Sequence, residues 1–201
     1  MRTSVKTDIL PLFSSPVYVA EDPSMPNIIR DIEGWEYHKA PREGSQTFEM
    51  NVLNKLPKFR DWLQYHVEEY VWKVLGIDKR CHEIVYTCSW INRHKFQEKT
   101  HDHSHRNSMY SGICYLQTHE RCGDLVFRDQ SYCMVAPRIQ TGNLYNSKQW
   151  TIQPKDGMVV MFPSSMVHLV TPNQIMRERY SLAFNIFLKG DFGNPTSFLK
   201  L

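Results

Sequence analysis

The hydrophobic positions of the chain change from a helical to an extended pattern near residue 78. Between Pro57 and Gly76, apolar residues recur at helical spacing, with a proline near the start and a glycine at the end, as is typical of helix boundaries. After Asp78, seven short extended runs cover residues 82–94, 109–117, 123–129, 149–154, 157–165, 167–172 and 179–189. Short strands separated by turn residues predict a β-sandwich or barrel, with the helix packed on its outside.

The pattern before the helix is weaker. Residues 8–20 alternate loosely between prolines, which predicts an edge strand. Residues 22–44 are rich in proline, glycine and charge, so we expect irregular structure with one helical turn around 28–32. We interpret residues 1–201 as a single domain: an N-terminal strand and helix (1–80), a β core (81–190) and a C-terminal tail (191–201).

The composition fits a folded, globular protein. Hydrophobic residues make up 41% of the 201 residues and charged residues 22%, which is ordinary for one domain. The net charge of +3 comes without a block of lysine and arginine, so a nucleic-acid partner is not indicated. No stretch approaches the roughly 20 apolar residues of a membrane span, and we expect neither export nor a membrane partner.

The five cysteines form no CxxC pair and are odd in number, which argues against a disulfide framework and against a zinc ribbon. We therefore expect a reducing, cytoplasmic setting. Cys88, Cys114 and Cys133 lie in or beside apolar runs and are predicted to be buried, inert thiols.

The segment THDHSHRNSMYSGICYL (100–116) places His101, His103 and His105 at alternate positions just before an apolar run. On an extended chain alternate side chains share one face, so these imidazoles favour a metal site over a core. The alternative is a solvated loop that binds metal adventitiously. His168 begins another extended run, and Arg179 opens the last one. A buried guanidinium needs an anionic partner.

The order of HSHRNSMYSGICYL, GDLVF, DGMVVMFPSSMVHLVTPN and RYSLAFN resembles the core of the 2-oxoglutarate- and Fe(II)-dependent oxygenases. The resemblance is to a prolyl-hydroxylase-like branch found in marine bacteria and phages, and it runs from about residue 10 to residue 188. It implies a mainly β fold with a flanking helix, namely a double-stranded β-helix of the jelly-roll, cupin-like type.

The resemblance also implies roles for individual residues. Three are the catalytic metal ligands: His103, His105 and His168. Five bind or lie near the cosubstrate: Arg179, Ser181, Tyr115, Asn92 and Asn185. His105 stands where the family usually has a carboxylate, and Asp102 would point to the opposite face of a regular strand unless a bulge re-aims it. His101 is predicted to be a bystander.

The activity that the resemblance implies is hydroxylation with Fe(II), 2-oxoglutarate and dioxygen. The substrate would be a prolyl or other side chain of a peptide or protein, or a small molecule. We expect a cytoplasmic enzyme, in the host cell if a phage encodes it. The oligomeric state stays open, with a homodimer among the options.

Other interpretations remain at this point. The chain could be a cupin-type protein whose three histidines serve another dioxygenase or isomerase reaction or only bind metal, without 2-oxoglutarate, or it could be a silent scaffold. Arg179 could pair with Glu178 or Asp124, and Arg177 is a local alternative for the carboxylate clamp. Substrate choice should depend on residues 22–54 and 128–148, and Trp35 and Trp150 are candidates for lining a substrate groove.

Overall fold

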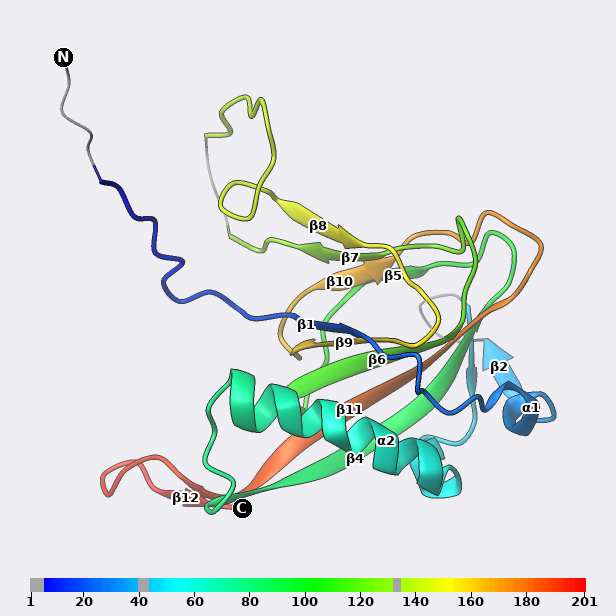
Figure 1. Ribbon diagram of the computed structural model, residues 1–201, viewed down its shortest axis with the longest axis horizontal. Coiled ribbons are helices and arrows are strands. Elements are labelled where there is room, and N and C mark those ends of the chain that lie inside the picture. The colour runs from blue at the N-terminus through cyan, green and yellow to red at the C-terminus, as the bar shows by residue number, and fades with distance from the viewer. Residues whose placement is uncertain (1–5, 40–43, 132–134) are drawn as a thin grey trace.

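Two antiparallel sheets face each other in the computed structural model, which describes residues 6–39, 44–131 and 135–201 (Figure 1). The larger sheet has eight strands, β12 (Leu199–Lys200) pairing with β11 and the other seven running in the order β1 (Tyr18–Glu21), β9 (Met158–Pro163), β6 (Tyr110–Gln117), β11 (Arg179–Phe192), β4 (His82–His94), β3 (Ser45–Thr47) and β2 (Tyr37–Lys39). The smaller sheet has the order β5 (Thr100–His103), β10 (His168–Val170), β7 (Leu125–Arg128) and β8 (Gln149–Ile152). This architecture confirms the predicted jelly-roll fold.

The strands of the larger sheet separate two apolar clusters because side chains alternate across a sheet. On β6, Cys114 and Leu116 pack in the cluster shared with the helix. Ile113 and Tyr115 belong to the second cluster, which contains residues of β7 and β9. Residues on this second face therefore point between the two sheets, which is where a jelly roll can hold a ligand.

The predicted helix is present and covers the outer face of the larger sheet (Figure 1). It consists of α2 (Pro57–Glu68), with proline at its start, followed by the π-helix η2 (Glu69–Val74). A 3-10 turn, η1 (Val52–Lys55), precedes it, and α1 (Ile29–Ile32) supplies the helical turn expected in the irregular segment. Phe59, Leu63 and Val67 are buried along α2 and fix it to the sheet.

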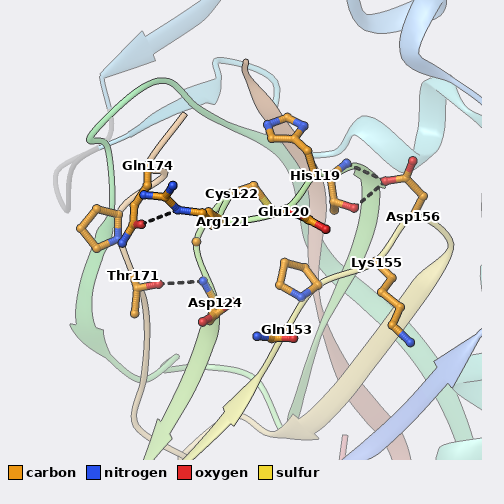
Figure 2. A pocket seen from close by; sticks show the side chains of 14 residues that line it. His119, Glu120, Arg121, Cys122, Asp124, Gln153, Lys155, Asp156, Thr171 and Gln174 are labelled. Carbon is orange, nitrogen blue, oxygen red and sulfur yellow. Dashed lines mark hydrogen bonds between the residues drawn. The ribbon is translucent and has the colours of Figure 1, made fainter. Parts of the chain in front are cut away.

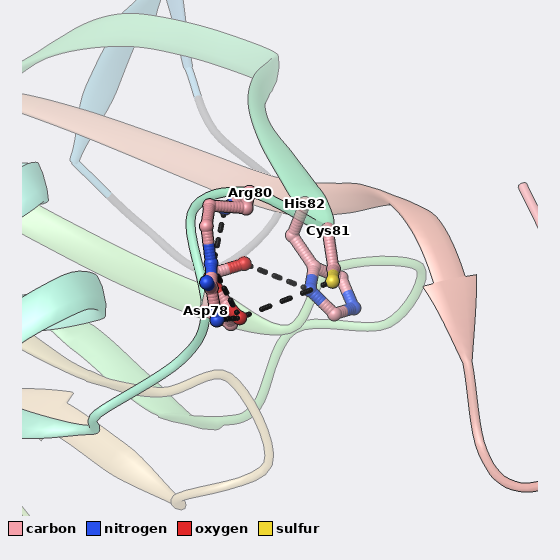
Figure 3. A network of polar contacts seen from close by, with 4 residues as sticks. All are labelled: Asp78, Arg80, Cys81 and His82. Atoms are coloured by element: carbon pink, nitrogen blue, oxygen red, sulfur yellow. Dashed lines mark hydrogen bonds and ion pairs between the residues drawn. The ribbon is translucent and has the colours of Figure 1, made fainter.

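The turn that leads into β4 is closed by its own polar groups (Figure 3). Arg80 donates from Nε and Nη2 to the two carboxylate oxygens of Asp78, at 3.0 and 2.7 Å. This charged hydrogen bond lowers the pKa of Asp78 to about 2. Cys81 and His82 also contact Asp78, so this cluster satisfies itself within one turn.

Two structural expectations need correction. The edge strand predicted over 8–20 is shorter, since only Tyr18–Glu21 pairs with β9, although it does lie at the sheet edge. Cys114 is buried as expected, but Cys88 is partly exposed and lines a cavity. Cys133 lies outside the described residues.

Within the described ranges, no helix is both long and apolar enough to span a membrane.

Candidate active site

His103, His105 and His168 meet at one end of the smaller sheet. His103 ends β5 and is the register partner of His168, the first residue of β10. His105 lies two residues beyond β5, where its backbone N–H donates to the Ser164 carbonyl at 2.9 Å. One potential ligand atom from each histidine lies within 4.8 Å of the others. The three imidazoles could therefore share one metal ion.

Backbone carbonyls fix the ring orientation of two of these histidines. His103 Nδ1 lies 2.8 Å from the His101 carbonyl oxygen, and His168 Nδ1 lies 3.0 Å from that of Met166. A carbonyl only accepts, so each Nδ1 carries the proton and the lone pair of the neutral ring lies on Nε2. Metal-binding histidines are commonly oriented in this way.

A side-chain network orients the third ring, that of His105. Its Nδ1 lies 2.6 Å from Ser111 Oγ and 2.9 Å from Asn185 Oδ1. Ser111 Oγ also contacts Ser164 Oγ at 2.8 Å, and the amide of Asn185 donates to Cys88 Sγ at 3.2 Å. Asn185, predicted to lie near the cosubstrate, thus has the His105 imidazole as its direct partner.

The two other potential metal ligands of the histidine segment, His101 and Asp102, do not join the cluster. His101 is exposed. The register of β5 against β10 does shift between Thr100 and His103, but the Asp102 carboxylate forms an ion pair with Arg128 at 3.0 Å and does not join the imidazoles. Among the described residues, the group that could hold a metal contains three histidines and no carboxylate.

Arg179 is buried in the same cavity, with an exposed fraction of 2%. Its guanidinium donates to the Gly123 carbonyl and to His94 Nδ1, both at 3.3 Å, and lies over the Tyr115 ring at 5.6 Å. In the described part of the chain, no carboxylate forms an ion pair with it, and its Nε has no hydrogen-bond partner. Neither Glu178 nor Asp124 therefore supplies the salt bridge that the sequence left open.

Two buried hydroxyls close to Arg179 share this lack of partners. Tyr115 Oη and Ser181 Oγ are both buried without a hydrogen bond inside the described structure. Tyr115 and Ser181 are register partners on β6 and β11, and burial raises the pKa of Tyr115 to about 12. Buried polar groups are rarely left unpaired, so these three side chains form an incomplete polar site. Arg177, the other candidate clamp, does not line this cavity.

His94 is a residue of this site that the sequence analysis missed. It ends β4, pairs in register with Arg179, and is only 3% exposed. Its Nε2 contacts Thr100 Oγ1 at 2.9 Å. Burial, together with the charge of Arg179, lowers the pKa of His94 well below its usual value, so a neutral imidazole accepts from the guanidinium. Nothing in the local sequence distinguishes His94, because its contact with Arg179 depends on the register between β4 and β11.

One cavity of about 500 Å³ connects the histidines and the arginine. Alternate residues of β11 line it, from Arg179 and Ser181 to Asn185. Asn92 lines it as well and accepts from Trp90 Nε1 at 3.0 Å. The tryptophans proposed for a substrate groove lie elsewhere, because Trp35 and Trp150 line two other hollows.

A larger hollow of about 820 Å³ lies at the opposite end of the strands (Figure 2). The loops after β6 and β10 and before β7 and β9 line it. Its polar groups largely bond one another: Asp156 accepts from the backbone and hydroxyl of Thr118 at 2.6 and 2.7 Å, and Arg121 donates to Gln174 at 3.0 Å. Although this hollow is larger, no metal-binding cluster among the described residues lies in it.

Comparison with known proteins agrees with this geometry. Residues 88–185 match the model of a family described as 2OG-Fe(II) oxygenases, a span that contains all three histidines and Arg179. Over these residues the chain is similar to the 2OG-Fe(II) oxygenases. Enzymes of this family are dioxygenases that use Fe(II), 2-oxoglutarate and dioxygen. A search of curated proteins found no match.

Solved structures of the same fold are distant in sequence. A 2OG-Fe(II) oxygenase family oxidoreductase from Burkholderia pseudomallei matches with a TM-score of 0.56 and 14% identity, over 76% of this chain and 72% of that one. HygX from Streptomyces hygroscopicus, solved with nickel and 2-oxoglutarate, matches with a TM-score of 0.55 and 10% identity, over 86% and 82%. These structures confirm the predicted fold, and the matching family model supports the predicted family. The origin in marine bacteria or phages and the internal division of the domain stay predictions.

Proposed function

We propose that His103, His105 and His168 hold Fe(II) in this oxygenase, and that Arg179, Ser181 and Tyr115 bind the distal carboxylate of 2-oxoglutarate. The enzyme would then hydroxylate a C–H bond of its substrate. The observation that carries this proposal is the buried guanidinium of Arg179, which has two unpaired hydroxyls beside it and no carboxylate among the described residues.

The three imidazoles suit a divalent iron ion. Imidazole nitrogen is a common ligand of Fe(II), and sites of this class leave positions open for cosubstrate and dioxygen. The hydrogen bonds from Nδ1 of His103 and His168 to backbone carbonyls leave Nε2 as the donor atom of each neutral ring. The absence of a carboxylate from the cluster would leave the ion with more positive charge than a two-histidine, one-carboxylate site.

The Arg179 site suits one carboxylate. A charge-assisted pair with the guanidinium would offset the cost of burying it, and carboxylate oxygens would also accept from two hydroxyls. His94 presents a lone pair to Arg179 and would hold the guanidinium in place without neutralising it. Asn92, which lines the cavity, completes the set of residues that we assign to the cosubstrate region, whereas Asn185 acts through His105.

When bound, Fe(II) and 2-oxoglutarate would supply the electrons that activate dioxygen, which is the oxidant, and 2-oxoglutarate would leave as succinate and carbon dioxide. The protein contributes positioning. Its buried arginine would hold the distal carboxylate of the cosubstrate, its three histidines would hold the metal, and the apolar residues between the sheets would exclude water. The substrate would enter from the cavity mouth, near His105 and Trp90.

The substrate is a peptide, a protein side chain such as a prolyl residue, or a small molecule, and the fold does not choose among them. Four free cysteines among the described residues support a reducing, cytoplasmic location. A cupin-type reaction at the three histidines without 2-oxoglutarate is the alternative function, but it would leave the incomplete site around Arg179 without a purpose.

Succinate formation separates the two functions. We expect the Fe(II)-loaded protein to convert 2-oxoglutarate to succinate, slowly without substrate, and Arg179→Ala to lose this conversion while retaining its metal. Metal content measured on the same samples is the control. If Arg179→Ala still forms succinate, with the same dependence on 2-oxoglutarate concentration as the wild-type protein, the proposed binding of the distal carboxylate by Arg179 is wrong.

A further inference from the structure

The wall of the active-site cavity is positively charged. Its charged side chains, among the described residues, are Arg106 and Arg179, and it contains no aspartate or glutamate. If the proposed function holds, the charges of Fe(II) and 2-oxoglutarate cancel, and three neutral imidazoles add none. A carboxylate ligand would have offset Arg179. Here the loaded cavity keeps the charge of Arg179 and gains that of Arg106.

Arg106 is exposed and lines the cavity, immediately after the proposed ligand His105. The His105 backbone N–H is tied to the Ser164 carbonyl at 2.9 Å, and Asn107 turns the chain with a φ of 58°. Within the described structure, no ion pair involves Arg106, whereas the nearby Arg128 is bound to Asp102 at 3.0 Å. Arg106 is therefore a cation that the protein itself leaves unmatched beside the site.

The same cavity also offers an apolar and aromatic wall. Trp90 and Met50 line it together with Arg106. The Trp90 ring lies 6.2 Å from the His105 ring, and its Nε1 is held by Asn92. An indole fixed in this way presents a rigid surface to a planar or apolar group.

We propose that Arg106 is a substrate-binding residue and that the substrate carries an oxyanion, a carboxylate or a phosphate, on an apolar body. This inference rests on the proposed function and names the substrate class of the same site. The anion contacts Arg106, and the apolar body lies against Trp90. An anion at this position also balances the excess charge of the loaded cavity, because opposite charges in a partly buried site attract strongly.

Simple aromatic probes test this assignment. The protein is loaded with redox-silent Ni(II) and saturating 2-oxoglutarate, so that the Arg179 site is filled, and is titrated calorimetrically with benzoate, phenyl phosphate, benzyl alcohol and benzylamine. We expect both anions to bind and the neutral and cationic probes to bind at least about tenfold more weakly. The tighter of the two anions identifies the kind of oxyanion.

Matched variants assign the binding to Arg106. Arg106→Gln should weaken both anions by about tenfold, while Arg106→Lys, which keeps the charge, should lose less. Arg121→Gln, which removes an arginine at the other end of the strands, should change nothing. Equal binding of all four probes, no binding of either anion, or an unchanged affinity in Arg106→Gln would overturn the inference.

Binding of 2-oxoglutarate, measured in the same samples, separates this inference from the function on which it rests. Arg106→Gln should bind 2-oxoglutarate normally. If the wild-type protein binds no 2-oxoglutarate, the proposed function fails. If it binds 2-oxoglutarate but does not discriminate among the probes, only the anionic substrate is wrong.

Discussion

The surroundings of Arg80 and Arg179 differ in a way that points to function. Arg80 is exposed and forms a bidentate contact with Asp78 in the same turn (Figure 3). Arg179 is buried, and within the described structure it donates to two neutral acceptors, His94 Nδ1 and the Gly123 carbonyl. The exposed arginine, which needs a partner least, has one, whereas the buried arginine lacks a carboxylate. An arginine in this second situation is expected to bind an anionic ligand.

The largest effect on the proposed active site is expected from the removal of a metal ligand. His168→Ala should lower the affinity for Fe(II) by more than about 100-fold, since even partners outside the ligand shell commonly cost 10- to 100-fold. Metal analysis after dialysis measures this loss. His101→Ala, which removes a histidine outside the cluster, should retain the metal, and equal losses in both variants would contradict the ligand set.

Replacing the buried arginine should have opposite effects on ligand binding and on stability. Arg179→Met should weaken 2-oxoglutarate binding by about 2–5 kcal/mol, the usual cost of truncating one partner of a buried charge pair. Without 2-oxoglutarate, the midpoint of thermal unfolding should be unchanged or higher, because an unpaired buried charge has been removed. A large fall in this midpoint would show that Arg179 is structural.

A substitution in the hydrogen-bond network around His105 should have a smaller effect on metal binding. Asn185→Leu removes the acceptor that orients the ring at Nδ1 and should weaken metal binding by about tenfold. Asn92→Leu is the matched change on β4, where the asparagine contacts Trp90, and it should leave the metal affinity unchanged. Similar metal affinities in the two variants would contradict the proposal that Asn185 orients the His105 ring.

The buried histidine beside Arg179 predicts a pH dependence. Its folded-state pKa lies well below 6.5, so below pH 6.5 the unfolded chain binds a proton that the folded chain does not. Stability should therefore fall as the pH drops below 6.5, with His94 contributing at most about 1.4 kcal/mol per pH unit. His94→Asn should flatten this slope in urea unfolding, and Thr100→Val, which keeps the imidazole, should not.

The smallest effect is expected from a substitution in the exposed turn that contains Asp78 and Arg80. Arg80→Ala removes the partner of Asp78, but exposed ion pairs contribute little to stability. We expect an unchanged thermal midpoint and an unchanged affinity for 2-oxoglutarate. A clear loss of either would remove the contrast between the two arginines.

Apolar runs were sufficient to predict the helix and seven of the strands. Most of these bury one face or both, although β10 spans only three residues and β8 is largely exposed. Apolar runs did not predict β2, β3 or β5, which are short and polar, such as Ser45–Thr47 and Thr100–His103. These strands depend on pairing with neighbours that are distant in the sequence. The same limit applies to η2, whose π-helical turn follows the α-helix without a sequence break.

The candidate site was predictable where a motif carries the chemistry, as at His103, His168 and Arg179. The residues that support it were harder to find. His94, Ser111 and Ser164 act through contacts between strands, and nothing in their local sequence distinguishes them. Asn185 was selected for its polarity in an apolar strand, but its partner, His105, becomes evident only when the sheet register is known.

The most direct test of the account is a crystal structure of the protein with Fe(II) and 2-oxoglutarate, prepared without dioxygen. We expect nitrogen atoms of His103, His105 and His168 at the metal and the distal carboxylate of 2-oxoglutarate on Arg179, with the hydroxyls of Tyr115 and Ser181 donating to it. A metal bound by Asp102 or His101 in place of His105, or a cosubstrate carboxylate away from Arg179, would contradict it.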